Sequence, residues 1–232
     1  MKIESNKKLI IFGTGEIAEL AKYYFEMDSD YTVVAFCADD DFVNSSTFLD
    51  LPLVKLSELE LKYPSSEYYV HVALSYSKLN KVREEKYTDI KKRGYRLASY
   101  ICSKSVYWDD LDIGDNCFIL ENQTIQPTVM IGDNVMIWSG NHLGHGSKIE
   151  DHVYISSHVV IAGHCSIGRR TFLGVNCTIK DFTSIGEDCF IAMGASVVSN
   201  IQDGGMVLAS KSDVYGVDDK ITKMIKRKYF GA

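Results

Sequence analysis

The feature that most constrains this chain is a branched aliphatic residue at every sixth position over its second half. The series runs without interruption and comprises Ile113, Ile119, Ile125, Ile131, Ile137, Leu143, Ile149, Ile155, Ile161, Ile167, Leu173, Ile179, Ile185, Ile191 and Val197. A short fixed period of this kind is typical of a solenoid, in which each repeat buries its apolar side chain only by stacking on its neighbours. It excludes an α-helix, whose hydrophobic period is ~3.6 residues.

A second register sharpens this interpretation. The residue two positions before the aliphatic is usually small or β-branched, as in Val129, Val153 and Cys165. Two inward positions per hexad fit the flat faces of a triangular prism, with three hexads in each coil of about 18 residues. Glycine often follows the aliphatic, as at Gly114 and Gly132, and we expect these glycines at corners, where the backbone needs conformations that a side chain would obstruct. The pattern predicts a parallel β-helix of hexapeptide repeats.

Composition narrows the function classes. The chain has 232 residues, enough for one large or two small domains, and 46% of them are hydrophobic. Its net charge of -6 gives no electrostatic reason to expect nucleic acid as a partner. No apolar run approaches the ~20 residues of a membrane span, and Met1 to Lys8 is too polar for a signal peptide. We therefore expect a cytoplasmic protein without membrane insertion.

The cysteines fit the same compartment. Four of the six occupy the small inward position of the hexad, and no two form a CxxC pair. These four are Cys117, Cys165, Cys177 and Cys189. We expect reduced packing thiols and no disulfide or metal site.

Residues 1–104 have the pattern of a small α/β domain. The expected strands cover residues 8–12, 32–37 and 68–74, and the expected helices cover 19–27 and 77–93, the second closed by Gly94. Between the first strand and helix lies a G-x-G-x-x-A turn, from Gly13 to Ala18. Such a turn presents backbone N–H groups to a phosphate.

This turn predicts a nucleotide site. Its residues would be Gly13, Thr14, Gly15 and Glu16, joined by Asp39 and Asp40 after the second strand and Ser75 after the third. An acidic residue at the second strand's end commonly accepts hydrogen bonds from a ribose. The segment is about half a dinucleotide fold and suits a mononucleotide-sized ligand. The alternative is that the glycines merely allow a tight turn.

The segment from Trp138 to Gly146 interrupts the bland repeat with an aromatic residue, an amide and two imidazoles. Departures of this kind mark function, because the scaffold itself needs none of them. Acyl transfer from a thioester requires a base near the attacking atom, and histidine suits this role because its unperturbed pKa is ~6.5.

The domain order and this Gly/His segment resemble the hexapeptide-repeat sugar acyltransferases with a left-handed β-helix. That family includes bacterial enzymes that N-acetylate nucleotide-linked amino-sugars and related sialic-acid O-acetyltransferases. The resemblance implies a Rossmann-like half domain over 1–104, a left-handed β-helix over 105–204 and a tail over 205–232. It also implies acetyl-CoA as acyl donor, no metal, a homotrimer and a role in surface polysaccharide synthesis such as O-antigen.

The resemblance also implies residue roles. His145 matches the general base, and in many members the residue before this histidine is a carboxylate that orients it; here it is Gly144. Glu150, Asp151, Asn141 or a backbone carbonyl could replace that carboxylate. We expect Asn141 and His142 to contact the acceptor substrate.

The coil length locates the groups that face His145. One coil further on lies Gly163, whose missing side chain would admit a thioester and whose N–H could bind the oxyanion. The expected coenzyme A site comprises Gly144, Ala162, Gly163, His164, Lys180 and Asp181.

The other distinctive residues have less specific interpretations. His152, His158 and His164 share one hexad offset, so we expect them to point outward on successive faces as solvated or interface residues, with His164 also near the active site. His71, inside the third strand, should be packed. Trp138 could floor the sugar pocket or cover an interface.

The tail contains a basic helix with Lys220, Lys223, Lys226, Arg227 and Lys228. It could meet the 3′-phosphate of coenzyme A or form a solvated face. The stretch over 207–211 lacks the proline that the family often has at the adenine site.

An acetyl-CoA-dependent N-acetyltransferase acting on a nucleotide-linked amino-sugar is the leading hypothesis. A sialic-acid-type O-acetyltransferase is the runner-up. A zinc carbonic anhydrase would need three histidines at a subunit boundary, here His142, His145 and His164. A non-catalytic scaffold is the remaining alternative.

Overall fold

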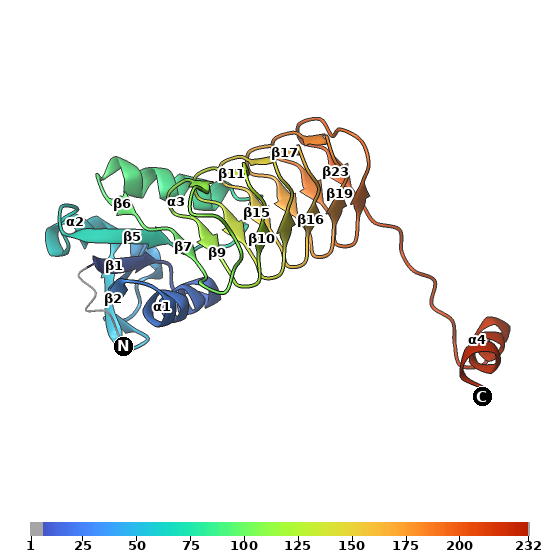
Figure 1. Ribbon diagram of the computed structural model, residues 1–232. Helices are drawn as coiled ribbons and strands as arrows, with labels where there is room; N and C mark the ends of the chain where they lie inside the picture. Colours follow the sequence, from blue (N-terminus) through green and yellow to red (C-terminus); the bar gives the residue numbers. More distant parts are fainter. Residues whose placement is uncertain (1–6, 232) are drawn as a thin grey trace.

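The computed structural model describes residues 7–231 and shows an α/β domain followed by a three-sided β-helix (Figure 1). The polar stretch expected to exclude a signal peptide falls mostly on residues 1–6, which lie outside the described residues, as does Ala232. No helix within residues 7–231 is long and apolar enough to cross a membrane.

The N-terminal domain contains short helices and one mixed sheet. Its elements are β1 (Lys7–Phe12), α1 (Glu16–Asp28), β2 (Tyr31–Ala38), η1 (Asp40–Phe42), β3 (Thr47–Phe48), β4 (Leu51–Lys55), η2 (Leu56–Glu58), α2 (Leu59–Lys62), β5 (Tyr68–Val72), α3 (Lys81–Lys92) and β6 (Arg96–Leu97). The sheet order is β3-β4-β2-β1-β5-β6, with only β3 antiparallel to its neighbour. The loops after β1, β2 and β5 therefore meet at one edge of the sheet, as in nucleotide-binding folds.

The three expected strands and two expected helices are present, with shifted ends. The largest shift is at α3, which begins at Lys81 and not at Ser77. Lys78, Leu79 and Asn80 adopt left-handed backbone angles, with φ of 50°, 53° and 65°. Asn80 is buried and its Nδ2 donates to Arg170 O in the β-helix at 2.7 Å, so a tertiary contact delays the helix.

The sequence interpretation missed β3, β4 and α2, which lie between β2 and β5. The hairpin turn at Leu49 and Asp50 contains no glycine, although both residues have positive φ. Turn patterns with glycine or proline therefore gave no signal at this position.

The β-helix consists of two-residue strands on three faces. Face 1 contains β10 (Thr124–Ile125), β13 (His142–Leu143), β16 (Val160–Ile161), β19 (Thr178–Ile179) and β22 (Ser196–Val197). Face 2 contains β8 (Asp112–Ile113), β11 (Met130–Ile131), β14 (Lys148–Ile149), β17 (Ser166–Ile167) and β20 (Ser184–Ile185). Face 3 contains β7 (Tyr100–Ile101), β9 (Phe118–Ile119), β12 (Met136–Ile137), β15 (Tyr154–Ile155), β18 (Phe172–Leu173), β21 (Phe190–Ile191) and β23 (Met206–Val207). Strands of successive coils pair in parallel, as the period predicted.

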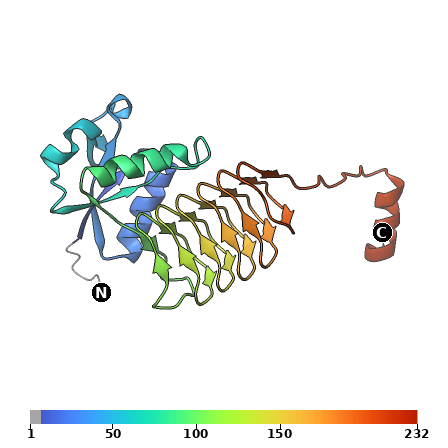
Figure 2. The same cartoon turned by 90° about the horizontal axis from the view of Figure 1, so that it is seen from above.

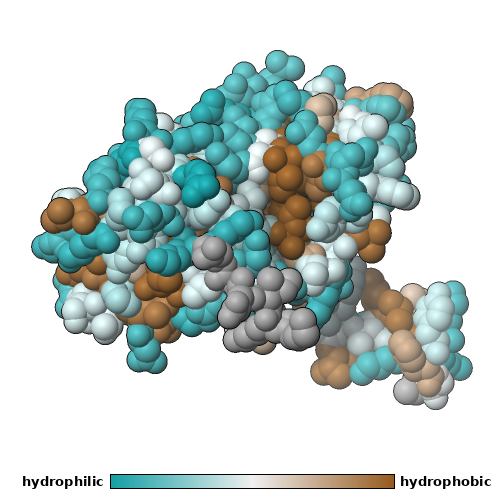
Figure 3. Space-filling view, turned by 60° about the vertical axis from the view of Figure 1, so that its left-hand side comes forward, coloured by the Kyte–Doolittle hydropathy of each residue, from teal (hydrophilic) through white to brown (hydrophobic). Residues whose placement is uncertain are grey.

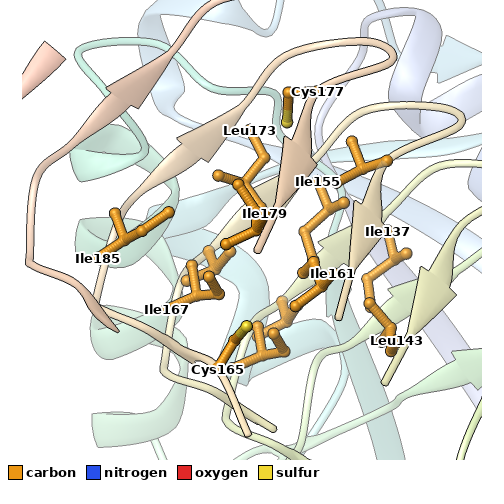
Figure 4. Packing of buried hydrophobic residues seen from close by; sticks show 14 of the residues in the cluster. Ile137, Leu143, Ile155, Ile161, Cys165, Ile167, Leu173, Cys177, Ile179 and Ile185 are labelled. Atoms are coloured by element: carbon orange, nitrogen blue, oxygen red, sulfur yellow. The ribbon is translucent and has the colours of Figure 1, made fainter. Parts of the chain in front are cut away.

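The periodic aliphatics form the core of the prism. Leu143, Ile161 and Ile179 stack on face 1 and are 0% exposed, and aliphatics of the other faces meet them inside (Figure 4). The small inward residues are buried beside them, and all six cysteines are free and buried. Stacking removes each large side chain from water, which stabilises by roughly 1.5–3 kcal/mol per residue.

Glycine is required after the aliphatics for a different reason from the one expected. Gly114, Gly132 and Gly144 do not have positive φ. A Cβ at Gly144 would lie 2.5 Å from Ala162 C in the next coil, and one at Gly132 would lie 2.8 Å from Asp151 N. The close approach of neighbouring coils, and not an unusual backbone conformation, therefore requires glycine here.

The left-handed residues lie two positions further along. They are Asn116, Asn122, Thr128, Asn134, His152, His158, His164, Arg170, Asn176, Phe182 and Asp188, with Gly140, Gly146 and Gly194 at the same offset. His152 points out of the prism as expected and lies at an interface, because the N-terminal domain covers it to 2% exposure and the Tyr87 ring of α3 lies 5.3 Å from its ring. His158 and His164, at the same offset, are exposed as expected.

Face 3 supports the N-terminal domain. Phe25 of α1 and the buried His71 of β5 pack on Phe118, with ring centroids 6.3 and 5.3 Å away. Arg83 of α3 donates to His152 O at 2.7 Å, which ties the helix to the repeat. In Figure 2, α3 lies at the junction of the two domains.

The tail leaves the prism after β23. An extended segment leads to α4 (Lys220–Ile225) and η3 (Lys226–Phe230), which lie apart from the body (Figures 1 and 2). The expected basic helix is therefore present. It also exposes Met224, Tyr229 and Phe230. Figure 3 shows hydrophobic as well as hydrophilic side chains on this detached part of the chain.

Candidate active site

The corner between faces 1 and 2, here the His145 corner, presents an exposed imidazole. Its turns cover residues 126–128, 144–146, 162–164 and 180–182 in successive coils. His145 follows β13, and its backbone N and its Nδ1 both lie 2.9 Å from Oε1 of Gln126 in the preceding coil. The ring is thus fixed along one edge and exposed along the other.

Gly163 lies against this imidazole. A Cβ at Gly163 would be 2.9 Å from His145 Cε1 and 3.0 Å from Nε2, so only glycine leaves this space open. His164 N donates to His145 O at 2.8 Å, and Phe182 N donates to Gly163 O at 3.0 Å. Among residues 7–231 no acceptor faces the Gly163 N–H.

The residues proposed to orient His145 are engaged elsewhere. Glu150 pairs with Lys148 at 3.1 Å, and Asp151 Oδ1 accepts from Asp133 N at 2.9 Å. Asn141 occupies the small inward offset, is 2% exposed, and its Oδ1 accepts from Val159 N at 2.6 Å. The partner is the side chain of Gln126, which the sequence interpretation did not consider.

The other residues expected at the coenzyme site lie on the same corner. The His164 ring meets His145 edge-on at 4.9 Å and stacks on Phe182 at 4.9 Å. Lys180 and Asp181 are exposed in the following coil. Ala162 lies over Gly144, within 2.6 Å of where a Cβ would be. His142 lies half-buried on face 1.

A second feature is a cavity of about 540 Å³ between the N-terminal domain and the β-helix. It is lined by the start of α1, the loop after β5, one residue of α3 and two aromatic side chains of the β-helix. These residues are Gly15, Glu16, Ile17, Leu20, Ala73, Leu74, Ser75, Tyr76, Ser77, Val82, Trp138 and Tyr154. Three expected ligand residues, Gly15, Glu16 and Ser75, therefore face one space.

Aromatic side chains form one wall of this cavity. Trp138 Nε1 donates to Tyr154 Oη at 2.5 Å, and the Tyr76 ring meets Tyr154 edge-on at 5.0 Å. Burial raises the pKa of Tyr154 to about 12, so its hydroxyl stays protonated. No residue within 7–231 accepts that proton, which leaves Tyr154 as a donor for a ligand.

The Gly13–Gly15 turn opens the opposite wall. Gly13 has φ of +132°, and a Cβ there would lie 2.7 Å from Ala73 O, so glycine is required for both reasons. Thr14 connects it to Gly15, the N-cap of α1, which has no side-chain cap. The first N–H groups of this helix are therefore available to an anion.

Asp39 and Asp40 lie at the expected strand end and have protein partners. Lys86 of α3 pairs with Asp39 at 2.7 Å. Asp40 accepts from Ser57 Oγ at 2.6 Å and from Ser57 N at 3.1 Å, and these bonds lower its pKa. Neither carboxylate lines the cavity.

The cavity and His145 occupy different corners of one chain. Trp138 follows face 3, whereas His145 follows face 1, so the width of face 1 separates them. The outward residues of face 1 carry no carboxylate or ammonium group: Thr124, His142, Val160, Thr178 and Ser196. Within residues 7–231 of a single chain, no group of three or more His, Cys, Asp or Glu side chains is arranged to hold a metal ion.

Two family models match consecutive parts of the β-helix. Residues 128–163 match the bacterial transferase hexapeptide model of six repeats, and residues 165–199 match the hexapeptide repeat of succinyl-transferase. The repeat domain belongs to the hexapeptide-repeat transferase family.

Curated relatives of this hexapeptide-repeat chain match about half of it or less. Acyl-[acyl-carrier-protein]–UDP-N-acetylglucosamine O-acyltransferase of Agrobacterium fabrum is 29% identical over 42% of this chain and 38% of its own length. The enzyme of that name from Rhizobium leguminosarum bv. trifolii is 29% identical over 51% of this chain and 50% of its own. This chain thus spans half or less of their length.

Solved structures extend the likeness to both domains. A mutant of perosamine N-acetyltransferase from Caulobacter crescentus, in complex with CoA and GDP-perosamine, superposes with a TM-score of 0.78 at 20% identity, over 90% of this chain and 97% of the other. The acetyltransferase domain of PglB from Neisseria gonorrhoeae, in complex with acetyl coenzyme A, gives 0.77 at 19%, over 87% and 95%. These likenesses confirm the expected fold, an α/β domain followed by a β-helix.

Two features of this hexapeptide-repeat chain escaped the sequence interpretation. Gln126 follows Ile125 at the offset that Gly144 and Ala162 also occupy, so the coil length could have revealed it. Arg83 lies 2% exposed beneath the cavity loop, and burial lowers its pKa to about 10. Its Nη1 approaches Ser75 O at 3.5 Å, a contact that no sequence pattern predicted.

Proposed function

We propose that this chain is an acetyl-CoA-dependent N-acetyltransferase that acts on the amino group of a nucleotide-linked amino-sugar. The observation that supports it most is the exposed His145 facing Gly163, whose N–H has no partner within residues 7–231. A base and an oxyanion donor side by side are what direct acyl transfer to an amine requires.

The proton moves in two steps. As the amine attacks the thioester carbonyl, His145 Nε2 accepts a proton from the attacking nitrogen. The Gly163 N–H donates to the oxygen that becomes negative, a contribution of roughly 3 kcal/mol. When the carbon–sulfur bond breaks, His145 returns the proton to the departing thiolate. Gly144, Ala162, His164, Lys180 and Asp181 would line the coenzyme path along this corner.

The cavity is the proposed site of the nucleotide-sugar. The N-terminus of α1 at Gly15 and Glu16 would receive phosphate through its free N–H groups, helped by Gly13, Thr14 and Ser75. Trp138 and Tyr154 offer the sugar an aromatic wall and a hydroxyl donor. Because Asp39 and Asp40 have protein partners, a role for them requires that a ligand displace Lys86 or Ser57.

The two halves of the site would come from two chains. His145 lies on one side of face 1 and the cavity on the other. A homotrimer that packs through the weakly polar face 1 would bring His145 of one copy to the cavity of another, with His142 at this interface. Six free cysteines fit a reducing cytoplasm, and the product would serve surface-glycan synthesis.

The test is an acceptor panel. Purified full-length protein is incubated with acetyl-CoA and UDP-, GDP- or dTDP-linked 4-amino-sugars, with the matching 4-hydroxy sugars as controls. Thiol release and product mass report the reaction. We expect transfer to an amino-sugar and a product stable to mild alkali, since amides resist it. No transfer to any amine in the panel contradicts the proposal.

Sugar O-acyl transfer is the second candidate, because the curated relatives are O-acyltransferases. It predicts an alkali-labile ester formed with the hydroxy sugar or with a sialic acid. The same site would act, but a hydroxyl makes a stronger demand on His145 as base.

A further inference from the structure

The geometry points to Gln126 as the residue that orients His145 and selects its tautomer, so that Nε2 is the basic nitrogen. The effect of Gln126 on catalysis rests on the proposed function. The tautomer of His145 does not depend on that function. Gln126 is half-buried. It lies one coil before Gly144, because Thr124 pairs with His142 in the parallel ladder.

One oxygen atom accepts two hydrogen bonds from the same residue. The His145 backbone N and its Nδ1 both lie 2.9 Å from Gln126 Oε1. A backbone N–H is always a donor, so the amide must present its oxygen and not its NH₂ group. The same oxygen then requires a hydrogen on Nδ1. The neutral imidazole therefore keeps its lone pair on Nε2.

This tautomer directs the lone pair toward the reacting side. The Cβ position of Gly163, where the side chain is missing, lies 3.0 Å from Nε2 and 3.3 Å from Nδ1, so both ring nitrogens border the open space. Nδ1 is already engaged by Gln126 Oε1, which leaves Nε2 as the nitrogen free to accept a proton there. The opposite tautomer would place a hydrogen on Nε2 and leave Nδ1 and Oε1 as two facing acceptors. A base with its lone pair against Gln126 could not take a proton from a substrate beside Gly163.

The coil packing explains why the partner comes from the preceding coil. A Cβ at residue 144 would lie 2.5 Å from Ala162 C and 2.6 Å from Gly163 N. No carboxylate can therefore stand directly before His145 in this chain. Gln126, at the same offset one coil earlier, reaches past the bare Gly144 to the imidazole edge.

The neutral amide has a distinct electrostatic consequence. A carboxylate at this position would favour the imidazolium form and require more alkaline conditions for the free base. Gln126 orients the ring and adds no negative charge near the acceptor amine.

The first test measures the tautomer directly. In protein labelled with ¹⁵N-histidine, two-bond ¹H–¹⁵N spectra distinguish a protonated Nδ1 from a protonated Nε2, and His145→Gln assigns the signal. We expect hydrogen on Nδ1 in the native chain and predominantly on Nε2 in Gln126→Met, which retains the side-chain length without an acceptor. Hydrogen on Nε2 in the native chain overturns the inference.

The second test is kinetic. Gln126→Met should lower kcat by about 10- to 100-fold with little change in the KM for acetyl-CoA. Gln126→Glu should retain the orientation and move the acidic limb of the pH–rate profile upward by about one pH unit. Gln202→Glu, an exposed site in the last coil, controls for the added charge and should leave both unchanged.

The outcomes separate this inference from the proposed function. A Gln126→Met chain with native tautomer and native kcat contradicts the role of Gln126. If no acceptor is acetylated, the proposed function fails, and the tautomer measurement alone decides the inference. If Gln126→Met does not fold, Gln126→Glu decides it, because an unshifted pH profile contradicts an orienting contact at this atom.

Discussion

Two corners of the same β-helix have opposite character. At the corner between faces 2 and 3, here the Asp133 corner, Asp133 Oδ1 accepts from Asp115 N at 3.0 Å, and Asp151 does the same for Asp133. At the His145 corner the equivalent offset holds His145 and Gly163, and the Gly163 N–H has no such acceptor within residues 7–231.

The coverage of the two corners differs as well. Helix α3 lies along the Asp133 corner, where the Tyr87 hydroxyl is 2.6 Å from carboxylate oxygens of both Asp115 and Asp133. Partial burial alone would raise the pKa of Asp133, but the bonds from Tyr87 and Asp115 N hold it below its ordinary value. No element of the described chain covers His145, which is exposed.

Backbone N–H groups are therefore satisfied at the Asp133 corner, whereas the Gly163 N–H at the His145 corner has no acceptor within residues 7–231. At the Asp133 corner, the hydrogen-bonded backbone groups and the covering helix α3 contribute to the stability of the fold. At the His145 corner, an N–H without a partner within residues 7–231 lies beside an exposed imidazole, an arrangement that suits the proposed acyl transfer.

The largest effect is expected at the His145 corner. His145→Ala removes the proposed base and should lower kcat/KM for acetyl transfer by about 10²- to 10⁴-fold. His158→Ala is the matched control, since this exposed histidine lies on a different corner. Steady-state kinetics with an amino-sugar acceptor measure both. Full activity in His145→Ala contradicts the assignment.

Acidic pH should lower the free energy of unfolding through the histidines buried where the N-terminal domain meets the β-helix. Burial lowers the pKa of His71 to about 4, and burial also lowers the pKa of His152. The unfolded chain protonates histidine near pH ~6.5, so between these values it binds more protons than the folded chain. Stability is therefore fully present above pH ~6.5 and falls as pH drops toward 4, by about 3 kcal/mol for His71.

Thermal unfolding at pH 7.5, 6 and 5 measures this loss. His152→Gln should reduce the pH dependence of the melting temperature, whereas His158→Gln, at the same hexad offset but exposed, should not. A melting temperature that stays constant from pH 7.5 to pH 5 would show that these histidines are already protonated or solvated in the folded chain.

A smaller effect is expected from Gly163→Ala. The added Cβ would lie 2.9 to 3.0 Å from the imidazole and displace it, with an expected loss of about 10²-fold in kcat. The melting temperature should barely change, because the exposed ring can move. Gly216→Ala, where the nearest atom is 3.5 Å away, is the control. Native kcat in Gly163→Ala would remove Gly163 from the site.

The smallest effect is expected at the Asp133 corner. Asp133→Asn loses the charge that Lys91 contacts at 3.1 Å and should lower the free energy of unfolding by about 1 kcal/mol. Denaturant titration measures it. Catalysis should stay within twofold, since the corner faces α3; a kcat loss comparable with that of Gly163→Ala would erase the distinction between the corners.

Much of the fold could be predicted, because in a solenoid the position of a residue within the hexad determines where its side chain lies. The sixfold aliphatic period predicted the strands and the core, and the coil length placed Gly163 over His145. Asn141 could have been placed correctly by the same rule, since it lies two residues before Leu143. For His152 the rule predicted an outward side chain but could not distinguish a solvated position from an interface, which is formed here by a domain outside the repeat.

The amino-acid pattern alone predicted the prism, the glycine-rich turn after β1 and the stacking of Gly163 on His145, since these depend on local pattern and on stacking between successive coils. Three features come from the three-dimensional packing instead: α3 covers the Asp133 corner, Gln126 contacts His145, and the cavity and His145 lie on different corners. Those outcomes depend on side-chain reach and on packing between the two domains, for which the repeat has no periodic signal.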